Sequence, residues 1–175
     1  MHFELVKSEP IYQGKVFNVR QDHLRLPDGK VTRLDVVEHS GAVTILPIDS
    51  QDQIWFIRQY RHPAGRMLLE LPAGVMDEGE DPLESAQREL QEEIGMAAES
   101  LTPLGDFFLA PGYSTEYMYV FMARGLRESQ LQPDEGEYIE IEKVPLAQAM
   151  ALVKSGRISD AKSLATLLLW HLSAS

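Results

Sequence analysis

Alternating apolar and polar positions dominate the first 60 residues, and this period is typical of β-strands. Residues 15–26 follow it up to a Leu-Pro-Asp-Gly-Lys turn, in which proline presets φ and glycine accepts a positive φ. Residues 31–38 then return as the second strand of a hairpin. Residues 42–48 are almost continuously apolar, as in a central strand, and residues 54–60 form a further strand.

The period changes from that of a strand to that of a helix after residue 80. Asp81 can cap the helix, Pro82 suits the first helical position, and Gly95 supplies a stop. We therefore predict a helix over residues 82–94. Its core face consists of the apolar residues that recur at helical spacing, Leu83, Ala86, Leu90 and Ile94.

The rest of the chain alternates again between strand and helix patterns. The interval 127–137 is polar and is expected to be a loop. Because strands and helices are interspersed, the fold class is α/β (α+β). We divide the chain into a strand segment, residues 1–40, and a main domain, residues 41–175, within one unit. The remaining predicted elements are strands at 101–109, 117–123 and 139–144, and helices at 145–154 and 160–172.

Charge narrows the range of partners. The chain has 27 acidic and 16 basic residues and a net charge of −11, which argues against nucleic acid or an acidic membrane as a partner. Cysteine is absent, so a metal would be held by oxygen or imidazole, and a reducing cytoplasm is the expected location. The longest apolar run, residues 164–172, is too short to span a bilayer.

Most of the net charge comes from residues 77–93, which hold eight acids and one base, Arg88. On the predicted helix, Glu89 and Glu93 lie side by side at the flank of the core face, with Glu92 nearby. Like charges at this spacing destabilise a helix, and no lysine occurs between Lys30 and Lys143 to offset them. A solvated face is the common explanation for acidic helices, but shared divalent cations fit better here. Carboxylate oxygens suit Mg²⁺ or Mn²⁺.

The spacing of these residues resembles the Nudix box. Gly74, five residues, Glu80, seven residues, and then Arg-Glu-Leu-Gln-Glu-Glu-Ile-Gly-Met at 88–96 agree with every defined position of that box. The resemblance implies a Nudix α/β/α sandwich with a mixed β-sheet, preceded by N-terminal antiparallel strands. It also implies hydrolysis of a nucleoside diphosphate linked to a further group. The main domain, 41–175, would be the Nudix hydrolase domain.

The same resemblance assigns roles within the box. Glu89, Glu92 and Glu93 correspond to the metal-binding glutamates, and the carbonyl of Ala73 to a further ligand. Arg88 corresponds to their orienting partner. Arg88 and Glu92 are also counted among the predicted catalytic residues. Glu80 corresponds to a supporting carboxylate, and Gly74 and Gly95 to glycines required by backbone geometry.

Segments outside the box resemble the ADP-ribose pyrophosphatases among the Nudix hydrolases, from about residue 12 to the C-terminus. These segments are Glu-Leu-Pro-Ala-Gly at 70–74, Arg-Gln-Tyr-Arg at 58–61 and Pro-Gly-Tyr-Ser-Thr-Glu at 111–116. Taken alone, the first residues of the last segment are an ordinary turn and the arginines ordinary surface residues. The resemblance nevertheless implies a set of substrate-binding residues, Arg33, Arg58, Arg61, Glu70, Pro111, Ser114 and Glu116.

The resemblance also implies that a glutamate of the acidic loop near residue 135 acts as the general base. The candidates are Glu135 and Glu137, of which we prefer Glu135 as base with Glu137 near a metal. The expected reaction is Mg²⁺-dependent cleavage of ADP-ribose or a related nucleoside diphosphate sugar into a nucleoside monophosphate and a sugar phosphate. Members of this group are homodimers, which implies the same here.

Three alternatives stay open. The first is the same chemistry on GDP-mannose or ADP-glucose. The second is a non-catalytic, nucleotide-sensing Nudix domain, which usually has a degraded box and a DNA-binding domain. The third is a Ca²⁺-binding protein, although residues 77–81 lack the spacing of an EF-hand loop.

Overall fold

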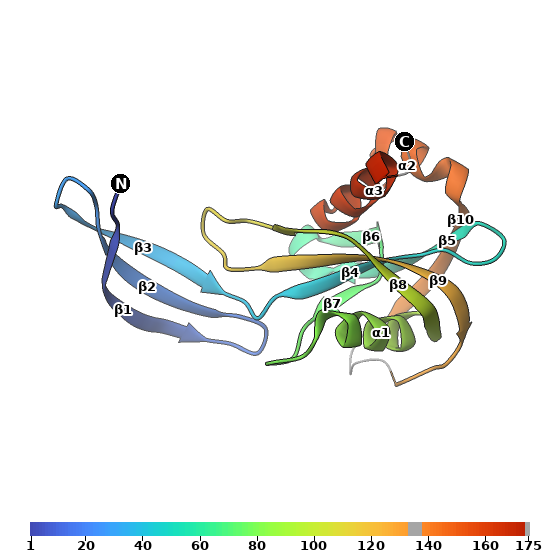
Figure 1. The fold of residues 1–175 in the computed structure, drawn as a ribbon, viewed down its shortest axis with the longest axis horizontal. Coiled ribbons are helices and arrows are strands. Elements are labelled where there is room, and N and C mark those ends of the chain that lie inside the picture. The colour runs from blue at the N-terminus through green and yellow to red at the C-terminus, as the bar shows by residue number, and fades with distance from the viewer. Residues whose placement is uncertain (133–137, 174–175) are drawn as a thin grey trace. The chain divides into compact units, whose positions relative to one another are not determined.

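The structure, a computed structural model, describes residues 1–132 and 138–173. The chain divides into two compact units (Figure 1). Unit 1 comprises Met1–Gly41 and Phe108–Tyr117, and unit 2 comprises Ala42–Phe107 and Met118–Ser175. The division expected from sequence, after residue 40, placed the segment 108–117 in the second part of the chain. Main-chain hydrogen bonds bind this segment to Val37, which accounts for its place in unit 1.

Unit 1 is built on an antiparallel sheet of three strands in the order β1-β2-β3. The predicted hairpin is confirmed, and Gly29 has the positive φ of 86° that the turn between β2 and β3 requires. Tyr113 accepts a hydrogen bond from the N–H of Val37, and Thr115 donates one to the carbonyl of Val37, so the segment 108–117 lies beside β3. The strands are β1 (Glu4–Gln13), β2 (Asn18–Arg25) and β3 (Val31–Glu38).

Unit 2 contains a mixed sheet and an antiparallel sheet. In the mixed sheet, β4 runs parallel to β9 and antiparallel to β7, in the order β7-β4-β9-β8. The second sheet has the order β10-β5-β6. The strands of the mixed sheet are β4 (Ala42–Pro47), β7 (Ala73–Val75), β8 (Met96–Phe108) and β9 (Tyr117–Glu128). Those of the second sheet are β5 (Gln53–Arg61), β6 (Arg66–Glu70) and β10 (Ile139–Pro145).

Helices cover opposite faces of these sheets, and Figure 1 shows α1 on one side of β4 and α3 on the other. The fully buried strand β4 contributes to two apolar clusters. Val43 and Ile45 pack with α1, and Leu46 packs with α2 and α3. The expected α/β/α arrangement is confirmed. The helices are α1 (Pro82–Glu93), α2 (Ala149–Lys154) and α3 (Ala161–Ser173), with short 3₁₀ turns η1 (His62–Ala64) and η2 (Leu146–Gln148).

The structure departs from the sequence prediction at a few elements. The helix expected over 145–154 begins as the 3₁₀ turn η2 and becomes α-helical only at Ala149. Strands β6 and β7 had no predicted counterpart, because the five residues of β6, Arg-Met-Leu-Leu-Glu, do not alternate and the three residues of β7 are too few to display a period of two. Within the described ranges, none of the helices has the length and apolar character needed to cross a membrane.

Candidate active site

Helix α1 is fixed by local signals at both ends and by one apolar face. The Asp81 side chain accepts a hydrogen bond of 2.8 Å from the N–H of Leu83, and Gly95 adopts a φ of 68° just beyond the helix. Ala86 and Leu90 are fully buried. Leu83, which the helical spacing placed on the core face, is instead 44% exposed. It lies in the first turn and lines a shallow surface cavity there, beyond the packed interior.

Arg88 connects the carboxylates of this region. Its Nε and Nη2 donate to the two oxygens of Glu80, each at 3.0 Å, and its Nη1 donates to Glu89 at 2.6 Å and Glu92 at 2.9 Å. The guanidinium also donates to the carbonyl of Val75 at 3.1 Å. One cation therefore fixes the rotamers of three carboxylates and joins α1 to β7.

These contacts set the charge states of the Arg88–Glu80 pair. Hydrogen bonds from Arg88 lower the pKa of Glu80 to about 2. The same bonds raise the pKa of Arg88 above its usual range. Both groups are therefore charged at neutral pH, and Arg88 remains a permanent donor to Glu89 and Glu92.

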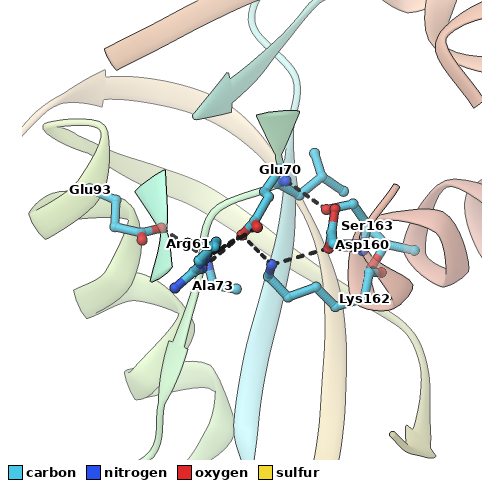
Figure 2. Close-up of polar contacts among 9 residues, drawn as sticks. Arg61, Glu70, Ala73, Glu93, Asp160, Lys162 and Ser163 are labelled. Carbon is cyan, nitrogen blue, oxygen red and sulfur yellow. Dashed lines mark hydrogen bonds and ion pairs between the residues drawn. The ribbon is translucent and has the colours of Figure 1, made fainter. Parts of the chain in front are cut away.

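The backbone at the start of β7 meets the carboxylates of Glu89 and Glu93. Oε2 of Glu93 accepts a hydrogen bond of 2.8 Å from the N–H of Ala73, as Figure 2 shows. A Cβ atom added to Gly74 would lie 1.9 Å from Cδ of Glu89, so a larger residue there would displace the Glu89 carboxylate or β7. Glu89 and Glu93 are each 7% exposed. The structure thus brings together Ala73, Glu89 and Glu93, three of the residues predicted to bind a metal.

The donor set of this region fits a hard divalent cation. Arg88 brings one positive charge to three carboxylates, and Glu93 adds a fourth. Carboxylate and carbonyl oxygens are the donors that Mg²⁺ and Mn²⁺ prefer. Within residues 1–132 and 138–173, no three acidic or histidine side chains converge in the arrangement of a metal site. Glu89 and Glu92 are turned toward Arg88, so binding of a cation would require some of these carboxylates to reorient.

A cavity of about 700 Å³ opens beside the C-terminal end of α1. Glu92 and Glu93 line one part of it, and apolar side chains from β5 and β10, Trp55, Ile139 and Ile141, line another. The predicted metal-binding carboxylates therefore border a space large enough for a small ligand.

The predicted substrate-binding residues of unit 2 lie on β5 and β6. Arg61 is partly exposed and donates to the carboxylate of Glu70 through Nε and Nη2. Arg58 is more exposed and lies 3.9 Å from Glu140 and from Glu142. Glu70 is only 1% exposed, and its carboxylate also accepts from Lys162. Because this carboxylate is directed to Arg61 and Lys162, an influence of Glu70 on a substrate would have to pass through Arg61.

The other predicted substrate-binding residues belong to unit 1. Arg33 is exposed on β3, opposite His23 of β2. Pro111 lies in a turn closed by hydrogen bonds from the N–H groups of Tyr113 and Ser114 to the carbonyl of Ala110. Ser114 accepts a bond from the N–H of Glu116. The turn expected at Pro111 is confirmed, whereas the roles of Arg33, Pro111, Ser114 and Glu116 in substrate binding stay predictions.

Two further residues, Glu135 and Glu137, lie outside the described residues, so their predicted role as base is not tested.

The sequence analysis did not identify Lys162 and its neighbours at the start of α3. Asp160 accepts from the N–H of Ser163, a capping contact that the sequence order Asp-Ala-Lys-Ser before an apolar run could have indicated. No local pattern points from Lys162 to Glu70, 92 residues away.

Comparison with known proteins gives concordant matches. A family model described as NUDIX domain matches residues 38–167, and one described as nucleoside diphosphate sugar hydrolase N-terminal domain matches residues 3–33. The chain is 37% identical over 160 residues to the ADP-ribose pyrophosphatase of Bacillus subtilis (strain 168), covering 90% of this chain and 86% of that protein. It is 40% identical over 174 residues to the ADP-ribose pyrophosphatase of Mycobacterium tuberculosis (strain ATCC 25618 / H37Rv), covering 97% and 83%. A crystal structure of an ADP compounds hydrolase superposes with a TM-score of 0.89 at 28% identity, covering 99% of this chain and 94% of that one.

Proposed function

The chain belongs to the Nudix family and is a Nudix pyrophosphatase, and from this premise we propose that its substrate is ADP-ribose or a closely related nucleoside diphosphate sugar. The reaction would cleave the pyrophosphate to give a nucleoside monophosphate and a sugar phosphate. The names of the similar proteins support this substrate class, since two of them are ADP-ribose pyrophosphatases.

The observation that carries the proposal is the approach of the Ala73–Gly74 backbone to the carboxylates of Glu89 and Glu93. A buried group of carboxylates repels a pyrophosphate unless cations intervene. The carboxylates of Glu89 and Glu93 therefore fit a cation site that faces an anionic substrate.

Mg²⁺, or Mn²⁺ in its place, would be held by the carboxylates of Glu89, Glu92 and Glu93 and the carbonyl of Ala73. When bound, such ions neutralise charge on the diphosphate and make water more acidic. Arg88 contacts the carboxylates of Glu89 and Glu92 and would keep both near the site while they reorient to bind the cation. Glu80 would hold the far side of that guanidinium.

The remaining roles come from outside this cluster. Arg61 and Arg58 would bind phosphate oxygens from β5, since both are partly exposed and arginine suits bidentate binding of phosphate. Arg33, Pro111, Ser114 and Glu116 of unit 1 keep their predicted roles as substrate-binding residues. Glu135 or Glu137 would accept the proton from the attacking water.

Unit 1 supports a homodimer as the working form of the enzyme. Its sheet exposes several large apolar side chains, which solvent disfavours and a second copy of the chain would cover. These side chains are Leu5, Ile11, Tyr12 and Leu34.

Product analysis tests the proposed reaction. The purified protein is incubated with ADP-ribose, ADP-glucose or GDP-mannose, each with Mg²⁺ and with Mg²⁺ plus EDTA. We expect AMP and ribose 5-phosphate from ADP-ribose, and none with EDTA. Preference for another of these sugar nucleotides would move the assignment within the substrate class. Binding without turnover of any of them would favour the nucleotide-sensing alternative.

A further inference from the structure

Glu70 is a buried carboxylate with cations on two sides. It is the last residue of β6, three residues before Ala73, and it is 1% exposed. From one side Arg61 donates to it through Nη2 at 2.7 Å and through Nε at 3.2 Å. From the other side Nζ of Lys162 donates to it at 2.5 Å. Figure 2 shows the Glu70 carboxylate between these two side chains.

The first turn of α3 holds the same stretch of chain at a second point. Asp160 accepts from Nζ of Lys162 at 3.1 Å and from the N–H of Ser163 at 2.9 Å. The Ser163 hydroxyl, fully buried, accepts a bond of 2.8 Å from the N–H of Leu71. The side chain of Glu70 and the backbone of Leu71 are therefore both attached to α3.

The next residues of this stretch are attached to other elements. The carbonyl of Pro72 accepts a bond of 2.9 Å from the N–H of Ile45 in β4, and the N–H of Ala73 donates to Glu93 in α1. Segment 70–74 is thus held by α3 at its start, by β4 along its length and by α1 at its end. Glu70 is only three residues from Ala73, whose backbone contacts the predicted metal-binding glutamates. A displacement of Glu70 is therefore expected to move that backbone.

Charge balance explains why Lys162 matters to Arg61. Burial raises the pKa of Glu70, but hydrogen bonds from Arg61 and the nearby charge of Lys162 outweigh this, and the pKa stays below its usual range. Lys162 takes part of the neutralisation, so Arg61 does not have to offset the buried charge alone. The Arg61 side chain is 37% exposed although it is bound to Glu70. It can therefore bind Glu70 and still face an anion.

We propose that Lys162 is a positioning residue for substrate binding, which acts through Glu70 to hold the Arg61 guanidinium and segment 70–74 in place for a nucleoside diphosphate. This proposal rests on the proposed function above. Lys162 need not touch the substrate, because its side chain is 15% exposed and bonds to Glu70 and Asp160.

A double-mutant cycle distinguishes this role from direct contact with the substrate. The variants are K162M, E70Q and E70Q/K162M, with K162R as the conservative replacement and K154M, on the exposed end of α2, as the control. Kinetics with ADP-ribose and Mg²⁺ give KM and kcat, and calorimetry gives the affinity for α,β-methylene ADP-ribose. Circular dichroism checks that each variant is folded.

The expected result is a split between KM and kcat. K162M should raise KM about tenfold and change kcat by less than about threefold, because it disturbs binding more than the chemical step. K162R and K154M should stay close to the parent protein. The double variant should have the KM of E70Q alone, since E70Q already removes the Glu70 carboxylate through which Lys162 is proposed to act.

Several results would overturn the proposal. An unchanged KM in K162M is one, and a further rise in KM when K162M is added to E70Q, as for a direct phosphate contact, is another. If K162M does not fold, the comparison of E70Q with E70Q/K162M decides: an equal KM supports the proposal, and a further rise in KM overturns it. If the parent protein neither binds nor cleaves ADP-ribose, ADP-glucose or GDP-mannose, the proposed function fails. Amide hydrogen exchange at Leu71 and Ala73 then tests the role of Lys162 without a substrate. Faster exchange in K162M supports the proposal that Lys162 holds segment 70–74 in place, and unchanged exchange refutes it.

Discussion

Replacing Gly74 with alanine tests how closely β7 must approach α1. The added Cβ would lie 1.9 Å from Cδ and 2.0 Å from Oε1 of Glu89. Real Cβ atoms essentially never come within 3.0 Å of another heavy atom, so a displacement of about 1 Å is needed. Either the Glu89 carboxylate rotates away from Arg88, or β7 moves away from α1. Both movements change the donor set proposed for the cation.

The two consequences differ in size. Overpacking of this kind costs about 1–3 kcal/mol of folding stability. A displacement of about 1 Å in a catalytic group can lower the rate about a hundredfold, so we expect kcat/KM of G74A to fall by that order. A variant that keeps a free energy of unfolding of several kcal/mol stays almost fully folded. The loss of activity should therefore far exceed what partial unfolding explains.

The assay compares G74A with a matched glycine variant. Gly156 has a φ of 71° and open space around its Cα, so G156A adds backbone strain of about 1 kcal/mol without a clash at the site. Urea unfolding gives the stability of each variant, and ADP-ribose hydrolysis across a Mg²⁺ titration gives kcat/KM. G74A should need more Mg²⁺, and G156A should behave as the parent. If G74A keeps more than about a third of parental kcat/KM, the close approach of β7 to Glu89 is not required for catalysis.

Two further changes test the cluster. E93Q keeps the shape of the side chain and the oxygen that accepts from Ala73, but removes the charge. Its kcat should fall about a hundredfold or more, with an unchanged circular dichroism spectrum, and near-normal turnover would contradict the metal role. The second change concerns pH. Because the pKa of Glu80 falls from 4.5 to about 2 on folding, its ion pair with Arg88 stabilises the protein above pH 4.5, and this contribution is lost as the pH falls toward 2. E80Q should therefore be less stable than the parent at pH 7 by on the order of 2 kcal/mol, allowing for screening near the surface, and this difference should shrink by pH 3 in urea unfolding. A difference independent of pH would mean that the Glu80–Arg88 pair does not carry it.

The parts of the site that sequence could predict are those specified by local signals. The helix with the clustered glutamates is marked by Asp81, by Pro82 and by a glycine stop, all within a few residues of its ends. Arg88 was predicted to orient the neighbouring carboxylates, and it contacts Glu89 and Glu92. These contacts span one and four residues, distances at which the helix itself fixes the geometry.

Contacts between distant residues could not be predicted in this way. Lys162 and Glu70 are 92 residues apart, and neither belongs to a pattern that names the other. The spacing rule also misplaced Leu83, because helical periodicity gives the direction of a side chain but not the extent of the packed core beyond the first turn. The requirement for glycine at position 74 was visible as part of a motif, whereas its physical reason, the Glu89 carboxylate, needed the structure.

Segment 70–74 shows why local and distant contacts have to act together here. Its backbone must lie against Glu89 and Glu93, which are two negative charges, and electrostatics offers it little reason to stay there beyond the hydrogen bond from Ala73. The neighbouring Glu70 adds a further buried negative charge, which would be costly without Arg61 and Lys162. The ion pairs at the start of the segment and the hydrogen bond at its end therefore fix the same short piece of backbone from opposite sides. A segment held at both ends can keep a carbonyl close to a carboxylate cluster while a cation and a diphosphate enter, whereas without the contacts to α3 only its pairing with β4 and its bond to α1 would hold it there.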